Sequence, residues 1–435
     1  MRKQYALQAF AALALVSITL YFAGCSQSSN PVSTPNQTGA NLPANITAGA
    51  AVPNHYIVVY KSGVDAESAS ADIASTHGLA LDYKYKHAIG GFAATITGEH
   101  LQKIMNDPRV DRVEPDYIAT AVQSATQQVT PWGITRVDAT ASKEYATGWT
   151  NGKFNGTNTN SVPGVEVYII DTGIYPDNDL NINSTTYGGC VSYQTNALYG
   201  TQWWDDNGHG THVSGIAAAY NDTMWVVGAA PGADLHAVKV LDNTGSGAFS
   251  TVIAGVDYVD SLKKAHKSVP MVANMSLGAQ TGTAQNSLDQ AVANAITDGV
   301  VFCVAAGNSG TNANGFSPAH VSAAITVAAY DNTNRLASWS NYGSIVDIGA
   351  PGVNIVSTWP NNSTQTLSGT SMATPHVTGS AALYLYKNQT ASPASVCTAL
   401  LNAAKNKSNP TISVGRKSSF GASGSQNLSV WDGTF

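Results

Sequence analysis

Five short apolar runs after Pro131 constrain the fold of this chain more than any other feature. They are separated by stretches of helical pattern that are rich in small residues, such as Phe249–Ala265 and Asn286–Asp298. Strands that alternate with helices in this way indicate a parallel sheet with helices on both faces. Such sheets place reactive side chains at the carboxyl ends of their strands. The expected strands are Val165–Ile170, Leu235–Val240, Met271–Met275, Val300–Ala305 and Ala324–Ala328.

A smaller unit over residues 53–120 precedes this body, which we place at residues 131–435. Its predicted order of strand, helix, strand, strand, helix and strand is that of ferredoxin-like folds. The stretch Thr120–Thr130 carries no charge, so residues 121–130 are expected to form an exposed linker open to proteolysis. The predicted elements are His55–Tyr60, Ala66–Thr76, Leu81–His87, Gly91–Ile96, Glu99–Met105 and Val110–Ile118.

Residues 1–25 have the charge pattern of an export signal. Arg2 and Lys3 precede the almost wholly apolar stretch Ala6–Ala23. This order, closed by a small residue, is typical of a secretory leader, although a run of this length could also remain as a membrane anchor. Residues 26–52 are polar, contain prolines and show no periodicity, so we expect a flexible tether.

The composition excludes several classes of protein. Among 435 residues, 21 Lys and Arg oppose 27 Asp and Glu, and only 11% of residues are charged while 43% are hydrophobic. A charge-driven disordered chain would be less apolar, and a nucleic-acid binder would need a basic surface. Four cysteines are too few for a disulfide scaffold. We therefore expect a globular protein that does not bind nucleic acid. We also expect a monomer.

Three motifs place a reactive side chain at the end of a predicted element. Asp171 leaves the first strand of the body just before a Thr-Gly turn, where an aspartate is often only a turn residue. His209 lies between glycines, ahead of a helix predicted over Val213–Tyr220. Ser371 starts an alanine-rich helix, where free N–H groups favour negative charge, although a plain cap serine is the alternative.

Other chemistries fit these motifs less well. His209 and His212 are three residues apart, whereas the zincin pair is four apart with an intervening glutamate, so we assign His212 to the helix core. Pro375 is expected in the first turn of its helix, where no N–H is needed. The segment around Ser371 lacks the G-x-S-x-G elbow of the α/β-hydrolases, which argues against an esterase or lipase.

The order Asp171, His209, Ser371 is the order of the triad in subtilisin. The likeness extends to the long and specific segments HGTHVSG and GTSMATPH, and to WGITRVDA and KVLDNTGSGAFS, which are similar to proteinase K relatives. The chain therefore resembles a subtilase of peptidase family S8 over residues 55–430, with an inhibitor I9-type propeptide. The resemblance implies an α/β, three-layer subtilisin-like fold with a mainly parallel sheet, preceded by a small α+β ferredoxin-like prodomain.

This resemblance implies a secreted serine endopeptidase that hydrolyses peptide bonds of proteins through an acyl-enzyme. Ser371 would be the nucleophile, and His209 would be first the base and then the acid. Asp171 would orient the imidazole. Asn308 would donate its side-chain amide to the oxyanion beside the Ser371 N–H, although a loop asparagine after a strand is the alternative. A catalytically silent, surface-anchored peptide-binding protein of the same fold is the competing function.

The resemblance also implies residues for substrate and metal. Two segments would flank an extended peptide as added strands, which predicts broad specificity with some apolar preference. One calcium ion would bind a carboxylate and two carbonyls, although that aspartate could equally cap or pair. The residues are Gly245, Ser246, Gly247, Ser276, Leu277 and Gly278 for substrate, and Asp347, Ser322 and Ala324 for calcium.

The prodomain would act as intramolecular chaperone and inhibitor, with self-cleavage within Thr120–Thr130, near Ser124. Residues Phe22–Cys25 resemble the lipobox of bacterial lipoproteins, with Phe22 in place of the usual Leu. Cys25 would then carry a lipid that anchors the precursor to a membrane, unless this is an ordinary cleavage site.

The two disulfides of the relatives are not reproduced, because Glu166, Lys267 and Ile325 occupy three of the half-cystine positions and Cys397 keeps the fourth. Cys303 is expected to be a buried free thiol. A pair between Cys190 and Cys397 stays open.

Overall fold

The computed structural model describes residues 49–121, 124–125, 132–136, 149–150, 153–154, 164–194, 202–220, 225–405 and 428–430. All of them belong to one compact unit, Ser33–Phe435. The predicted export signal, the lipobox and residues 26–48 of the predicted tether lie outside the described residues. Among the helices within the described ranges, none combines the length and apolar character that a membrane crossing requires.

Residues 51–121 fold in the predicted order. The four strands form an antiparallel array in the order β4-β1-β3-β2. Asp65 caps α1 by accepting a hydrogen bond from the Ser68 N–H (2.8 Å), and Gly78 ends the helix in the left-handed conformation. The elements are β1 (Ala51–Tyr60), α1 (Ala66–His77), β2 (Leu81–Tyr85), β3 (Gly91–Thr95), α2 (Gly98–Met105) and β4 (Val110–Ala121).

The larger part contains the predicted parallel sheet, in the order β17-β16-β14-β12-β8-β10-β9. Every pairing in it is parallel. Each strand of five or more residues matches a predicted strand to within two residues at either end. The strands are β8 (Glu166–Asp171), β9 (Val191–Ser192), β10 (Asp234–Lys239), β12 (Met271–Met275), β14 (Val300–Ala305), β16 (Ile325–Tyr330) and β17 (Ile348–Pro351).

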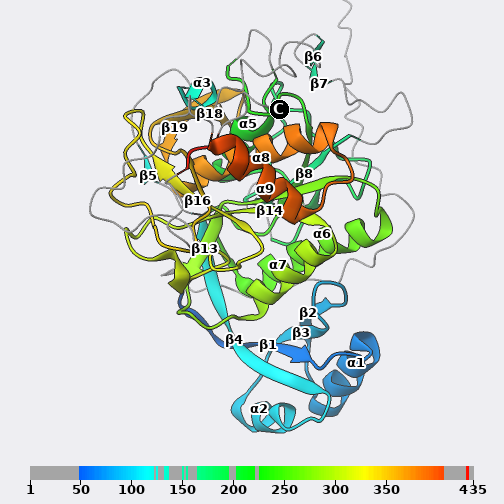
Figure 1. Cartoon of the computed structure of the whole chain (residues 1–435). Coiled ribbons are helices and arrows are strands. Elements are labelled where there is room, and N and C mark those ends of the chain that lie inside the picture. Colours follow the sequence, from blue (N-terminus) through cyan, green and yellow to red (C-terminus); the bar gives the residue numbers. More distant parts are fainter. Residues whose placement is uncertain are drawn as a thin grey trace, which may run out of the picture. The chain divides into compact units, whose positions relative to one another are not determined.

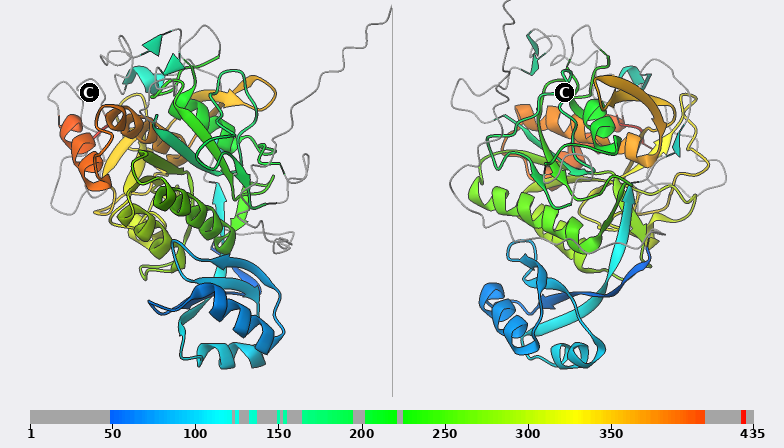
Figure 2. Two further views of the ribbon diagram at one scale, coloured as in Figure 1. Left: turned by 90° about the vertical axis from the view of Figure 1, so that its right-hand side faces the viewer. Right: turned by 180° about the vertical axis from the view of Figure 1, so that it is seen from behind.

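Helices cover both faces of this sheet (Figure 2). Along β8, Val167 and Ile169 lie in a core with α5, α8 and α9, whereas Tyr168 and Ile170 lie in a core with α6 and α7. Successive strand residues point to opposite faces, so a strand buried on both faces is expected to be mostly apolar, as the four central residues of β8 are. The helices are α5 (His209–Ala218), α6 (Phe249–Ala265), α7 (Ser287–Thr297), α8 (Thr370–Lys387) and α9 (Pro393–Ala404).

Shorter elements complete the body. A three-stranded antiparallel sheet has the order β18-β19-β5, and β13 pairs with β15. The elements are β5 (Ser124–Ala125), α3 (Trp132–Arg136), β6 (Trp149–Thr150), β7 (Lys153–Phe154), β11 (Ser246–Ala248), β13 (Leu277–Gln280), η2 (Ala313–Gly315), β15 (Phe316–Ser317), β18 (Ile355–Trp359) and β19 (Ser363–Ser368).

The prodomain strand β4 continues into the body, where it pairs antiparallel with both β11 and β13 (Figure 1). Two carboxylates of β4 also meet helix N-termini of the body. Asp116 accepts the N–H of Ser250 (2.9 Å) in the first turn of α6, and Glu114 accepts the N–H of Ser287 (2.7 Å), the first residue of α7. A carboxylate at this position satisfies orphan N–H groups and complements the helix dipole.

The helix after the glycine-flanked histidine begins earlier than predicted. It spans His209–Ala218, whereas the sequence pattern predicted Val213–Tyr220. Asp205 accepts a hydrogen bond from the Thr211 N–H (2.9 Å), so a side chain outside the predicted helix satisfies its first turn.

The predicted linker is partly strand. β4 continues through Ala121, and Ser124 and Ala125 pair with β19. The other residues of 121–130 lie outside the described residues. Pairing with a remote strand edge is a tertiary contact that local sequence does not encode.

None of the three cysteines within the described ranges, Cys190, Cys303 and Cys397, forms a disulfide. Cys303 is buried in β14, as predicted. Cys190 and Cys397 do not pair.

His55 of the prodomain gives a testable dependence of stability on pH. Its ring lies between Asp116 (2.9 Å) and Asp82 (2.8 Å). Burial alone would lower the pKa of His55, but the hydrogen bonds to Asp116 and Asp82 outweigh it and raise the pKa to about 9. The protonated ring therefore stabilises the folded prodomain fully below about pH 6.5, and this contribution disappears as the pH rises through 9.

We expect the free energy of unfolding of a Ser371→Ala chain to fall between pH 6.5 and 9 by up to about 3 kcal/mol more than that of the same chain with His55→Gln. Urea unfolding at several pH values measures this difference. His266→Gln, at an exposed position of the body, is the control. If the free energy of unfolding changes with pH equally in the chains with and without His55→Gln, His55 is not the group responsible.

Candidate active site

The three predicted catalytic side chains all lie at the carboxyl-end side of the parallel sheet. Asp171 is the last residue of β8, His209 is the first residue of α5, and Ser371 is the second residue of α8. All three side chains are fully buried. In the precursor, therefore, each group is shielded from water.

The Asp171 carboxylate holds the imidazole of His209. Oδ1 of Asp171 lies 2.7 Å from Nδ1 of His209 and also accepts the Thr172 N–H (2.7 Å). A carboxylate that accepts from Nδ1–H leaves Nε2 as the nitrogen able to take a proton. Nε2 of His209 is buried and has no hydrogen-bond partner among the described residues.

The Ser371 hydroxyl points to a different acceptor. It donates to the Ser276 carbonyl (3.0 Å), and the Ser276 hydroxyl donates to the Ser371 carbonyl (2.9 Å). The structure thus brings Asp171 and His209 together, while Ser371 bonds to Ser276. A rotation about the Cα–Cβ bond of Ser371 changes the acceptor without moving the backbone.

Pro375 is the sixth residue of α8 and not in its first turn, which corrects the prediction. Its missing N–H deprives the Ser371 carbonyl of the usual helical partner four residues on. The Ser276 hydroxyl supplies a donor to that carbonyl instead.

Asn308 follows β14 and is oriented by the residue before Ser371. Its side-chain oxygen accepts both the N–H (3.0 Å) and the hydroxyl (2.7 Å) of Thr370. An amide whose oxygen is occupied in this way presents its NH₂ group in a fixed direction. Sequence reasoning missed Thr370, although its place beside Ser371 in the GTSMATPH segment could have pointed to it.

A second network joins β8 to the start of α5. The Thr172 hydroxyl donates to Asp205 (2.9 Å) and accepts the Gly210 N–H (2.8 Å). Burial raises the pKa of Asp205, and its hydrogen bonds oppose that rise. A Cβ at Gly210 would lie 2.0 Å from the Gly173 carbonyl oxygen, so a larger residue would separate α5 from the Asp171 strand. Thr172 and Asp205 were also missed.

His212 lies in the body of α5, as expected. Its Nε2 lies within hydrogen-bond distance of two backbone carbonyls, of Gln365 (3.0 Å) and Ile355 (3.2 Å). Burial lowers its pKa to about 3. Within the described ranges, the residues include no group of three or more side chains able to hold a metal ion.

The predicted substrate segments flank the chain's own strand β4. Gly247 of β11 lies opposite Ala119, and Gly278 of β13 lies opposite Thr120. A Cβ at Gly278 would lie 2.7 Å from the Ser317 carbonyl oxygen, so glycine keeps this strand close to its neighbour. β5, which follows β4 in the chain, pairs with β19 in a separate sheet.

Asp347, the predicted calcium ligand, precedes β17. One of its carboxylate oxygens accepts the Thr326 N–H (2.8 Å). Burial raises its pKa to about 7, and this backbone bond opposes the rise. Within the described ranges no salt bridge reaches Asp347. A partly buried carboxylate without a protein cation fits a calcium ligand, and carbonyls such as those expected from Ser322 and Ala324 would complete the site.

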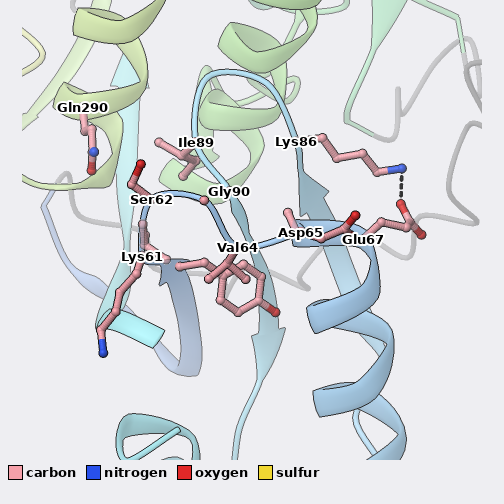
Figure 3. Close-up of a pocket in the computed structure, with 13 residues that line it drawn as sticks. Lys61, Ser62, Val64, Asp65, Glu67, Lys86, Ile89, Gly90 and Gln290 are labelled. Carbon is pink, nitrogen blue, oxygen red and sulfur yellow. Dashed lines mark ion pairs between the residues drawn. The ribbon is translucent and has the colours of Figure 1, made fainter. Parts of the chain in front are cut away.

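A pocket of about 430 Å³ lies elsewhere, between the β1–α1 and β2–β3 loops of the prodomain (Figure 3). Lys86 and Glu67 form an ion pair at its edge, and Gln290 of α7 also lines it. None of the predicted catalytic, substrate or calcium residues lines this pocket.

Comparisons with known proteins agree with this architecture. The family model "Subtilase family" (Peptidase_S8) matches residues 163–422, and the model "Peptidase inhibitor I9" matches residues 55–121. The chain is 39% identical over 398 residues to an extracellular serine proteinase from Thermus sp. (strain Rt41A), covering 86% of this chain and 90% of that protein. It is 36% identical over 359 residues to subtilisin E from Bacillus subtilis (strain 168), covering 81% and 85%.

A solved structure of a cold adapted subtilisin-like serine proteinase is similar with a TM-score of 0.51 and 35% identity, over 70% of this chain and 99% of that chain. The predicted subtilisin-like fold and I9-type prodomain are therefore confirmed. The chain belongs to the subtilase family of serine endopeptidases and carries an I9 inhibitor domain ahead of its catalytic body.

Proposed function

We propose that this chain is a secreted, self-processing endopeptidase precursor in which Asp171, His209 and Ser371 form the catalytic triad. The hydrogen bond between Asp171 and His209 (2.7 Å) carries this proposal. Secretion is supported by the extracellular proteinase to which the chain is similar and by the predicted export signal, residues 1–25.

In the proposed mechanism Ser371 turns its hydroxyl from the Ser276 carbonyl to Nε2 of His209. It then attacks the substrate carbonyl carbon while His209 takes the proton, and Asp171 stabilises the imidazolium. The amide NH₂ of Asn308 and the Ser371 N–H stabilise the oxyanion. His209 then protonates the leaving amine, and a water molecule hydrolyses the acyl-enzyme by the same steps in reverse order.

Substrate binding can release the nucleophile. Ser276 directly precedes β13, whose backbone pairs with the β4 strand. A substrate strand extended by one residue along this edge would compete for the Ser276 carbonyl, which the Ser371 hydroxyl occupies in the precursor. Losing that acceptor would favour the Ser371 hydroxyl turning to His209.

The prodomain inhibits by occupying the same edge. Its strand β4 lies between β11 and β13, where a peptide substrate would add as a strand. The caps that Glu114 and Asp116 provide for α7 and α6 hold it there. These contacts also support a chaperone role, because they stabilise two helices of the body.

The cleaved bond would lie between Ala121 and Ser124. β4 pairs with the substrate strands as far as Ala121, and Ser124 pairs with Ser368, three residues before Ser371. Only the three peptide bonds of this interval separate the two paired segments.

A Ser371→Ala chain should therefore stay full length, whereas the wild type should yield a body beginning at Val122, Gln123 or Ser124. Intact mass and amino-terminal sequencing measure this, and the mass of the unprocessed Ser371→Ala chain, which keeps Cys25, reports any lipid on that residue. Ser395→Ala, an exposed serine of α9, should process normally. Identical maturation of the wild type and Ser371→Ala would show that self-processing is wrong.

A sulfonyl fluoride should label the wild-type body at Ser371. A catalytically silent peptide-binding protein of the same fold would remain unlabelled, so this reagent separates the two functions.

Asn308→Ala should lower kcat by about 10²–10³ with a smaller effect on KM, because the lost donor acts mainly on the oxyanion. Steady-state kinetics on a peptide anilide measures this. Asn314→Ala, on an exposed turn, is the matched control. An unchanged kcat would remove Asn308 from the proposed oxyanion site.

We further propose one calcium ion on Asp347 and the carbonyls of Ser322 and Ala324. Calcium at about 100 times its Kd would stabilise the folded state by about 2.7 kcal/mol, so chelation should lower Tm. Asp347→Asn should abolish the difference in Tm between the protein with calcium and the protein with chelator. Asp331→Asn, in a surface turn that bonds only its neighbours, should keep it. A calcium-dependent Tm that survives Asp347→Asn would place the ion elsewhere.

A further inference from the structure

Lys239 is a buried cation that the proposed mechanism does not use. It is the last residue of β10, directly opposite Asp171 in the parallel pairing with β8, and it is fully buried. Its ammonium donates to the Thr172 carbonyl (2.7 Å), the Asp206 carboxylate (2.8 Å) and the Leu241 carbonyl (2.9 Å). An ammonium has three donors, so all three are used.

Two of these acceptors lie on the segments that carry Asp171 and His209. Thr172 follows Asp171 in the chain, and Asp206 lies three residues before His209. The Lys239 side chain therefore ties the end of β8 to the loop that enters α5. A displacement of the end of β8 or of the loop before α5 would change the contact between the Asp171 carboxylate and the His209 imidazole.

Stability alone does not explain why an ion pair occupies this place. Replacing a buried ion pair by apolar residues of similar volume is often neutral or stabilising. Lys263 shows that a buried lysine of this chain can do without a carboxylate, since it donates to the carbonyls of Lys267 (3.0 Å) and Val269 (2.7 Å). The Lys239–Asp206 pair therefore adds two compensating charges beside the proposed site.

We propose that Lys239 is a positioning residue for the reaction. It fixes the Asp171 strand against the His209 loop, and Asp206 is the counter-ion that keeps the electrostatic potential at His209 balanced. This inference rests on the proposed triad.

Removing either charge of the Lys239–Asp206 pair should shift the acid limb of kcat/KM in a definite direction. The His209 imidazole contacts the Asp171 carboxylate of β8 and interacts electrostatically with His212 of its own helix, and Asp205 and Asp206 lie four and three residues before it in the chain. Removing the Lys239 charge takes a positive charge away from the neighbourhood of the proposed site, which favours the imidazolium and moves the acid limb of kcat/KM to higher pH. Removing the Asp206 charge has the opposite effect.

The test measures kcat and KM of the mature enzyme on a chromogenic tetrapeptide anilide across the acid limb of its pH profile. Lys239→Met should lower kcat by about 10²-fold with little change in KM, the size expected when reacting groups are misplaced by about 1 Å. Its acid limb should move up in pH, and that of Asp206→Asn should move down. The variant that combines Lys239→Met with Asp206→Asn should have the acid limb of the wild type, but its kcat should stay below the wild-type value. Lys263→Met, the matched buried control, should lose stability and keep the wild-type kcat and pH profile.

A Lys239→Met enzyme with a lower Tm but wild-type kcat and acid limb would overturn the inference, as would acid limbs that move in the same direction in both single variants. If Lys239→Met does not fold, Asp206→Asn decides the question, because it keeps the lysine and its two carbonyl acceptors. Processing or sulfonyl fluoride labelling that survives Ser371→Ala would overturn the triad itself. Loss of both in Ser371→Ala, with Lys239→Met unchanged, would overturn only the positioning role.

Discussion

The contact between the Asp171 carboxylate and the His209 imidazole is the constraint around which the site is built. A buried carboxylate is costly unless donors reach it; here the Thr172 N–H and the imidazole both donate to Oδ1, whereas Oδ2 has no hydrogen-bond partner among the described residues. The backbone of Asp171 is fixed as well, because its carbonyl accepts the N–H groups of Val240 and Leu241. The position of α5, and with it the direction of the second imidazole nitrogen, follows from this anchored strand end.

The sequence predicted the parallel sheet, the order of elements and the residues at the strand ends, because hydrophobic periodicity and local turn chemistry are written in neighbouring residues. It did not predict groups that act from a distance. The start of α5 depends on Asp205, the orientation of Asn308 depends on Thr370, and the carbonyl that Pro375 leaves without a helical donor depends on Ser276. The contacts of Thr370 with Asn308 and of Ser276 with Ser371 join residues 62 and 95 positions apart, so no local pattern specifies the pairs, whereas Asp205 lies only six residues before its partner Thr211.

Inhibition by the prodomain and its proposed assistance in folding would depend on the same contacts. The same strand, β4, closes the small sheet against β1 and continues between β11 and β13. Its carboxylates Glu114 and Asp116 satisfy helix termini whose N–H groups would otherwise depend on water. Because the affinity of β4 for the body and the stability of α6 and α7 share these bonds, a change that weakens one also weakens the other.

A buried acid–imidazole contact involves one of the positions that the resemblance aligns with a half-cystine of the relatives. Glu166 occupies one of the half-cystine positions, and its carboxylate lies 2.6 Å from Nε2 of His236, whose ring stacks on Tyr168 at 4.6 Å. The contact joins β8 to β10, which are already paired, and it does not restrict the unfolded chain as a covalent bond would. Its contribution exists only while the folded sheet keeps water away. The stability of this body therefore depends on the packing of the two helix layers on the sheet, and any local opening of β8 from β10 exposes the pair and removes its benefit.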